Sequence, residues 1–423
     1  MSPLFRAWAQ LKALTTPRTH ILGSTFNCHN AYPKARRASA YTRINLKPYH
    51  HVVKVEGSMG KSENHGQNLV GQLKSIPSHI TALRIEDTPS NEEWAILGSH
   101  FTNVQSLEMD TGWNEDLNDK ELPLHWQLER YKLGSASGEV IGSPHIRQGR
   151  VRHLILLLTS GLRFEGPTTN EKADYITVRE GPPEERKIEI TFIPELVQTW
   201  TYNKYSGKQD PPLDEDNHPP TTINMRTLEI IENDAIDALC RMAIALPHLV
   251  ANLTTLTIRS THCQDFHFTN ECMIQELLPQ LSGLEMLRLS IGEIFENESR
   301  LPSLYTWLPP NLSTLRFRGP ASLTKPPEWE NLIKAFESET FLPYLRRLSF
   351  VLDLYYEPRE NVTPGGRKRD EKKAPVHILH EARAACEPLY EAARKRGIMI
   401  EQLYDPWSDE CATLRQVDGR WLC

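Results

Sequence analysis

The residue types most able to bind a metal gather in one short segment of the chain. His262, Cys263, His267 and Cys272 lie within eleven residues and supply four nitrogen or sulfur atoms. Zinc takes four such ligands in a tetrahedral arrangement, so the set is chemically sufficient. The segment has no C-x-x-C pair, however, and it follows an expected strand, where such side chains pack or face water. We therefore expect no metal.

Two further groups of polar residues have plain structural explanations. His377 and His380 lie one helical turn apart, which suits a ligand pair, but no third ligand is evident and we expect a solvated helix face. A basic run contains Arg367, Lys368, Arg369, Lys372 and Lys373. This run fits a nuclear localisation signal or a solvated loop, and we favour the loop.

Enzyme signatures are absent from the sequence. It contains no G-x-x-x-x-G-K-[ST], no G-x-G-x-x-G after a strand, no G-x-S-x-G and no H-E-x-x-H. We expect no catalytic activity and no cofactor. A site assembled from distant residues would escape such a search. The alternative is therefore a hydrolase or transferase whose site is formed by an insertion at residues 164–220.

Composition limits the possible partners. The chain has 423 residues, of which 39% are hydrophobic, and a net charge of −6, so no global field favours nucleic acid. The longest apolar run, Leu154 to Leu158, is too short to span a bilayer, and we expect no membrane partner. Seven scattered cysteines without a secretion signal indicate a reducing compartment.

The N-terminal segment differs from the rest of the chain. Residues 1–55 contain no Asp or Glu but several Arg and Lys residues, and we expect a basic, poorly ordered segment. An acid-free start with arginines also fits a mitochondrial transit peptide. We expect a cytoplasmic or nuclear protein, with a mitochondrial location as the alternative.

The elements that must position any site form a repeat. An apolar-x-x-apolar-x-apolar pattern recurs nine times, with its middle residues at Leu83, Leu107, Tyr131, Leu154, Leu228, Leu256, Leu287, Leu315 and Leu348. The spacing is about 24 residues in the first four units and 28 to 33 in the last five, which is typical of leucine-rich repeats. The final apolar-x-apolar step has the period of a strand, so its two large residues face the core.

Helical spacing of apolar residues precedes several of these strands, for example around Leu239 and Leu332, and proline turns such as Leu246-Pro247 lie between helix and strand. The sequence thus predicts an α/β fold: an irregular leucine-rich-repeat solenoid over residues 56–423, with parallel strands on its concave face and helices on its convex face. An insertion at about 164–224 and a loop at about 357–375 interrupt the rhythm, and a closing helix and a last strand follow.

Charged residues flank the inward leucines of the late repeats. They are Arg259, Arg288, Arg316, Arg318 and Arg347. Because strands lie about 4.8 Å apart, we expect these arginines to form a contiguous, exposed ladder on the concave face. Glu86, Glu108, Asp110 and Glu229 take the equivalent positions of earlier repeats. We therefore expect a face that is acidic early and basic late, and that binds an acidic protein surface; charges that merely keep the sheet soluble are the alternative.

Several sequence blocks carry a family resemblance. Besides the leucine-rich units, they are Gly138-Glu139-Val140, Ser143-Pro144-His145-Ile146, Gly161-Leu162-Arg163-Phe164-Glu165-Gly166-Pro167 and Tyr404-Asp405-Pro406-Trp407-Ser408. Together they resemble the substrate-receptor part of fungal F-box and leucine-rich-repeat proteins, over roughly residues 70 to 420. The resemblance implies protein recognition as a ubiquitin-ligase adaptor. Residues 1–51 show no Leu-Pro-x-Glu opening of an F-box, so ligase subunits remain an open partner.

Overall fold

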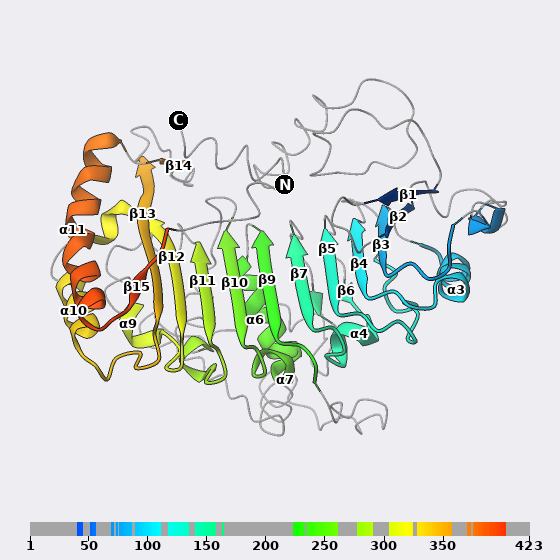
Figure 1. The fold of residues 1–423 in the computed structure, drawn as a ribbon, viewed down its shortest axis with the longest axis horizontal. Coiled ribbons are helices and arrows are strands. Elements are labelled where there is room, and N and C mark those ends of the chain that lie inside the picture. The colour runs from blue at the N-terminus through cyan, green and yellow to red at the C-terminus, as the bar shows by residue number, and fades with distance from the viewer. Residues whose placement is uncertain are drawn as a thin grey trace, which may run out of the picture.

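The computed structural model describes most of the repeat region. The described residues are 40–44, 51–55, 69–71, 73–74, 76–86, 89–110, 117–134, 140–157, 163–164, 223–232, 235–260, 277–290, 304–324, 328–357, 370–373 and 375–402. Their strands form one long sheet that runs the length of the molecule (Figure 1). Outside the described residues lie the His262–Cys272 segment, the residues 165–222 of the insertion and the basic run Arg367–Arg369.

Ten strands of this sheet are parallel and pair in chain order. They are β2 (His51–Val55), β3 (Ala82–Glu86), β4 (Ser106–Asp110), β5 (Arg130–Gly134), β7 (His153–Leu157), β9 (Thr227–Glu232), β10 (Thr255–Ser260), β11 (Met286–Ser290), β12 (Thr314–Pro320) and β13 (Arg347–Glu357). The parallel α/β arrangement expected from the repeat is confirmed.

Shorter strands lie at the margins of the sheet. At one end β1 (Ala40–Ile44) pairs antiparallel with β2. At the other end β14 (Asp370–Lys373) pairs antiparallel and β15 (Met399–Ile400) pairs parallel with β13. A separate small sheet joins β6 (Val140–Ile141) to β8 (Arg163–Phe164).

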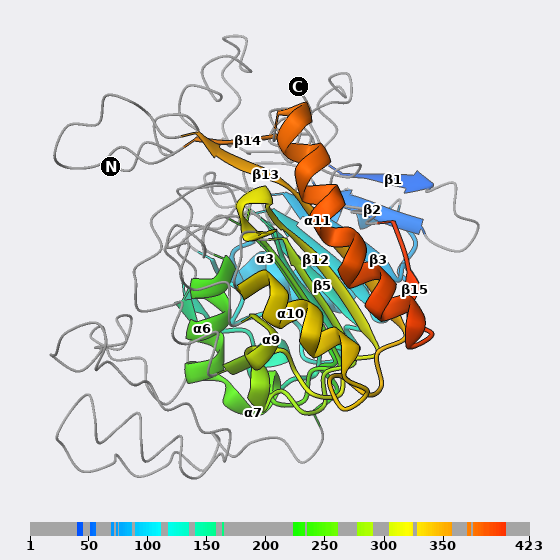
Figure 2. The same ribbon diagram turned by 90° about the vertical axis from the view of Figure 1, so that its left-hand side faces the viewer.

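Helices lie against one face of the long sheet, as the end-on view shows (Figure 2). They are α3 (Asn91–His100), α4 (Pro144–Arg147), α6 (Ala235–Ala245), α7 (Pro247–Val250), α9 (Leu304–Trp307), α10 (Glu328–Glu337), α11 (Val376–Lys395) and the 3-10 helices η3 (Leu278–Gln280) and η6 (Ala321–Thr324). A capping box at Ser90 and Glu93 begins α3, and a proline at the first position begins α7.

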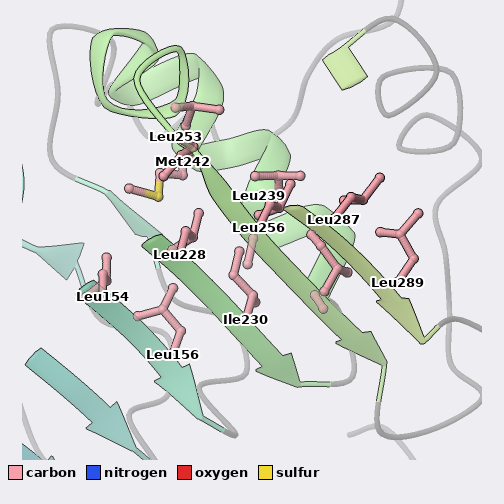
Figure 3. Close-up of a cluster of buried hydrophobic side chains, with 14 of the residues drawn as sticks. Leu154, Leu156, Leu228, Ile230, Leu239, Met242, Leu253, Leu256, Leu287 and Leu289 are labelled. Carbon is pink, nitrogen blue, oxygen red and sulfur yellow. The ribbon is translucent and has the colours of Figure 1, made fainter. Parts of the chain in front are cut away.

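The core lies between the sheet and these helices. Parallel register aligns the middle residue of every repeat unit, so that Leu256 pairs with Leu287, Leu287 with Leu315, and Leu315 with Leu348. All four side chains are fully buried, which confirms the expected inward ladder. Figure 3 shows the central part, where Leu239 and Met242 of α6 pack over the ladder from Leu154 to Leu289. Burial of this apolar stripe drives the stacking of successive units.

Polar side chains join neighbouring units at the turns that precede the strands. His100 Nε2 donates to the carbonyl oxygen of Ile76 at 2.8 Å, and Trp126 Nε1 donates to that of Phe101 at 2.6 Å. The same bond recurs from His145 to Pro123 at 3.0 Å. A further example joins His248 to Arg147 at 3.2 Å. Each bond satisfies a turn carbonyl of the preceding unit.

The structure differs from the sequence-based boundaries in two places. Strands β1 and β2 lie within the basic segment 1–55 that was expected to be poorly ordered, because β2 pairs with β3 and so extends the sheet. Strand β14 lies within the expected loop 357–375, where it pairs with the long strand β13. Pairing with an exposed sheet edge satisfies backbone groups that short-range sequence patterns do not report.

Candidate functional site

The side chains opposite the core ladder form what we call the charged face of the sheet. Its middle row runs through residues that are Cα partners on successive strands: Arg84, Glu108, Lys132, Ile155, Glu229, Thr257, Arg288, Arg316 and Ser349. Because side chains alternate along a strand, residues two positions away on each strand form parallel rows on the same face.

The five arginines expected to bind a partner share this face but do not form one ladder. Arg288 and Arg316 are direct neighbours in the middle row. Arg259 and Arg318 belong to the next row, separated there by Ser290, while Arg347 lies in the row on the other side, beside Thr314. The expectation of a contiguous ladder was wrong because the five arginines lie at three different offsets from the inward leucines, and parallel register keeps each offset in a row of its own.

The arginines also differ in burial, contrary to the expectation that all would be exposed. Arg259 is 1% exposed and Arg288 is 7% exposed. The side chains of Arg318 and Arg316 are 13% and 22% exposed, whereas that of Arg347 is 57% exposed. An incoming protein therefore reaches Arg347 and part of Arg316 most directly.

Carboxylates of the described residues bind Arg316, Arg318 and Arg347. Arg318 makes a bidentate pair with Asp353 of β13, with Nε–Oδ1 and Nη2–Oδ2 distances of 2.8 and 3.0 Å. Glu401, which follows β15, lies 3.2 Å from Nη2 of Arg316 and 3.6 Å from Nε of Arg347. Two guanidinium groups thus share one carboxylate, so this group of three side chains keeps an excess positive charge. We call it the Glu401 clamp.

The early repeats are not simply acidic. Glu108 lies 2.9 Å from Lys132 Nζ and 3.9 Å from Arg84 Nε, on the two neighbouring strands. Glu229 accepts a 2.7 Å hydrogen bond from His153 Nε2. The predicted polarisation from acidic to basic is therefore corrected: on the early strands, basic side chains lie next to the carboxylates of Glu108 and Glu229, so the charge alternates in sign. The side chains of Glu86 and Asp110 are outside the described ones.

Sequence reasoning missed an apolar area in the middle of the charged face. Ile155 and Leu157 of β7 and Ile231 of β9 point away from the core ladder, yet each is at most 1% exposed. The signal was present in the sequence as the unbroken apolar run from Leu154 to Leu158. Such a run is typical of a strand that is buried on both faces.

Groups with shifted pKa values lie away from the charged face. Burial lowers the pKa of His145 and of His248, although the hydrogen bond of each to a backbone carbonyl opposes the shift. Burial also raises the pKa of the Cys386 thiol in α11 to about 12, which keeps it protonated and weakly nucleophilic. His377 and His380 are exposed on the same helix, as a solvated helix face requires.

The described part of the chain has neither a metal-binding cluster nor a membrane-spanning helix. It contains no group of three or more His, Cys, Asp or Glu residues placed to hold a metal ion, and the His262–Cys272 set lies outside it. None of its helices is long and apolar enough to cross a membrane. No protein-family model matches the chain, and no curated protein matches it either.

Proposed function

We propose that this chain is an irregular leucine-rich-repeat solenoid that recognises another protein with the charged face of its sheet. The observation that carries the proposal is the register, in which nine repeat units each add one parallel strand in chain order, with helices on the opposite face. Stacked units of this kind build an extended and rigid surface, on which the side chains of one row recur about every 4.8 Å, the spacing between strands. A rigid surface loses little entropy when a partner binds.

We infer that the partner presents an acidic surface. In the Glu401 clamp, Arg316 and Arg347 share a single carboxylate, and the side chain of Arg347 is 57% exposed. A carboxylate of a partner would find the same two guanidinium groups as hydrogen-bond donors. Hydrogen bonds between ionised groups are stronger than neutral ones, and arginine can present two donors to one carboxylate.

The resemblance to the receptor part of F-box and leucine-rich-repeat proteins suggests what recognition achieves. In this proposal the bound protein is a substrate held for a ubiquitin ligase, and the protein acts in the cytoplasm or nucleus without catalysing a reaction itself. Neither nucleic acid nor a membrane is a partner, and no cofactor or metal takes part.

Affinity purification with mass spectrometry, followed by binding measurements with the purified partner, tests the proposal. We would compare the wild-type chain with Arg347→Glu and with the matched control Arg383→Glu, which reverses an exposed arginine on α11. Loss of one charge-assisted contact should weaken binding about tenfold or more in Arg347→Glu, and higher salt should weaken the wild-type complex. Equal affinity of Arg347→Glu and wild type would contradict the proposal.

A further inference from the structure

Strand β15 adds only two residues to the edge of β13. Met399 pairs with Arg347, and Ile400 pairs with Leu348. The backbone N–H groups of Met399 and Glu401 donate to the carbonyl oxygens of Arg346 and Leu348, both at 2.8 Å. In Figures 1 and 2, β15 (red) lies at the end of the sheet, after the chain has left the long helix α11.

The side chains of this short strand make two specific contacts. Ile400 is partly buried against the hydrophobic core, whereas Met399 is 60% exposed. The carboxylate of Glu401 binds Arg316 and Arg347 in the Glu401 clamp. Arg316 belongs to β12 and therefore reaches across β13 to meet Glu401.

The residue between them is small. Ser349 is the Cα partner of Arg316, and the register of Leu348 with Ile400 brings Glu401 next to Ser349 on the other side. A long side chain in place of Ser349, which is 1% exposed, would stand between the guanidinium and the carboxylate. Because the Ser349 side chain is short, the Arg316 guanidinium can extend over it to a carboxylate at this edge of the sheet.

We propose that Ile400 and Glu401 are an internal occupant of the partner site, and that the partner contributes an extended segment in which an aliphatic residue is followed by glutamate. This inference rests on the proposed function and names the ligand class for it. The partner segment pairs with the edge of β13, inserts its aliphatic side chain where Ile400 lies and places its carboxylate between Arg316 and Arg347. Addition of a strand to a sheet edge is a general mode of peptide recognition.

Replacement of β15 by a partner strand costs little free energy because β15 is short. Within the described part of the chain it pairs with two residues of β13, whereas β13 itself continues to Glu357 and β14 joins it from Leu354 onward. A longer partner strand would make more backbone hydrogen bonds with this edge than β15 does. Elements with few such bonds open locally at low cost in free energy. Release of Glu401 therefore limits the apparent affinity for the partner, since only the open fraction binds.

A peptide that copies the internal occupant provides a probe. We would measure binding of a fluorescein-labelled peptide with the sequence of residues 397–402, Gly-Ile-Met-Ile-Glu-Gln, to the full chain by fluorescence anisotropy. Glu401→Gln removes the internal carboxylate, and we expect it to bind the peptide about tenfold more tightly than wild type. The matched control is Glu387→Gln, which removes an ion-paired carboxylate on α11, 2.6 Å from Arg394. It should bind like wild type.

The same peptide with glutamine in place of glutamate should bind Glu401→Gln at least tenfold more weakly, and Arg347→Glu should no longer bind the peptide.

Hydrogen exchange on the wild-type chain provides a second measurement. Saturating peptide should expose the amides of Met399 and Glu401, whose bonds to β13 it replaces. Suppose that wild type and Glu401→Gln bind the peptide equally well and Arg347→Glu does not bind it. This result would show that Ile400 and Glu401 do not occupy the partner site, while the proposed binding of an acidic partner would stand. Absence of peptide binding to Glu401→Gln would overturn the inference alone, because the purification experiment decides the function separately.

Discussion

Each middle residue of a repeat unit is held between the equivalent residues of two neighbouring strands. Leu287 is fully buried between Leu256 and Leu315 in the inward ladder. Leu287→Ala should lower the free energy of unfolding by about 2 to 5 kcal/mol, because backbone pairing on both sides prevents collapse of the cavity. Urea denaturation measures this. The exposed Glu285→Ala, just before the same strand, should change it by only about 0.5 kcal/mol.

Buried histidines make the stability of the fold depend on pH. His145 is 0% exposed, and its Nε2 donates to the Pro123 carbonyl oxygen, while its Nδ1 has no hydrogen-bond partner among the described residues. Protonation would place a charge on Nδ1 inside the protein, and burial accordingly lowers the pKa of His145 and of His248. The unfolded chain therefore binds more protons than the folded chain below about pH 6.5, the ordinary pKa of histidine.

Stability should thus fall as the pH drops from about 6.5 towards the lowered pKa values, with a limiting slope of about 1.4 kcal/mol per pH unit for each of these two histidines. Thermal melts between pH 7.5 and pH 5 measure the effect. His145→Gln should reduce the slope, because it removes one of the two groups. The exposed His377→Gln on α11 should leave it unchanged, and a slope that survives His145→Gln undiminished would contradict this assignment.

Helix α11 closes the end of the sheet through a small number of polar contacts. Trp329 of α10 donates its Nε1 proton to the carbonyl oxygen of Ala385 in α11 at 2.8 Å, and Tyr390 donates its hydroxyl proton to the carbonyl oxygen of Phe350 in β13. Just after α11, Arg396 donates to the carbonyl oxygens of Phe336, Phe341 and Leu342 at 3.2, 2.6 and 3.1 Å. One guanidinium therefore holds the turn between α10 and β13.

Arg396→Ala should destabilise this end by about 1.5 to 3 kcal/mol, because three carbonyl groups lose a charged donor. Hydrogen exchange of α10, α11 and the start of β13 measures the local effect. Arg394→Ala is the matched control, since Arg394 makes one exposed ion pair with Glu387, worth at most about 1 kcal/mol. Equal effects of the two substitutions would show that the three carbonyl bonds contribute little.

On the scale of the whole molecule, the sheet continues across the insertion. Strands β7 and β9 pair in the same register as the other repeats, although residues 158–226 separate them in the chain. Apart from Phe164 in β8, the residues 164–220 at which a catalytic site was considered lie outside the described ones, so the alternative as a hydrolase or transferase gains no support from geometry. The rows of the charged face therefore stay in register from β3 to β13, with a buried apolar area at Ile155 and Ile231 between the charged parts.

The proposed role as a substrate receptor raises the question of whether the chain binds the adaptor of a ubiquitin ligase. Because residues 1–51 lack the Leu-Pro-x-Glu opening of an F-box, we expect the 423-residue chain to form no stable complex with the Skp-type adaptor of ubiquitin ligases. A pull-down with purified adaptor tests this, with a known F-box protein as positive control. A stoichiometric complex would show that these residues contain an adaptor-binding element of another pattern.

The sequence by itself determined the parallel α/β sheet and its inward ladder. Burial of a leucine stripe selects apolar residues at a fixed spacing, so the pattern from Leu83 to Leu348 reports strands and register directly. It also assigned Arg259, Arg288, Arg316, Arg318 and Arg347 to one face, since alternation along a strand follows from backbone geometry.

Only the tertiary structure decided what those arginines can do. Their division into three rows, the burial of Arg259 and Arg288, and the pairing of Arg318 with Asp353 depend on neighbouring strands. The Glu401 clamp joins residues 85 positions apart in the chain. Charge pairs of this kind produce no periodic pattern in a sequence, because polar positions on a surface are not restricted to side chains of one size or hydropathy. Which two charged residues pair depends only on their proximity in the folded chain.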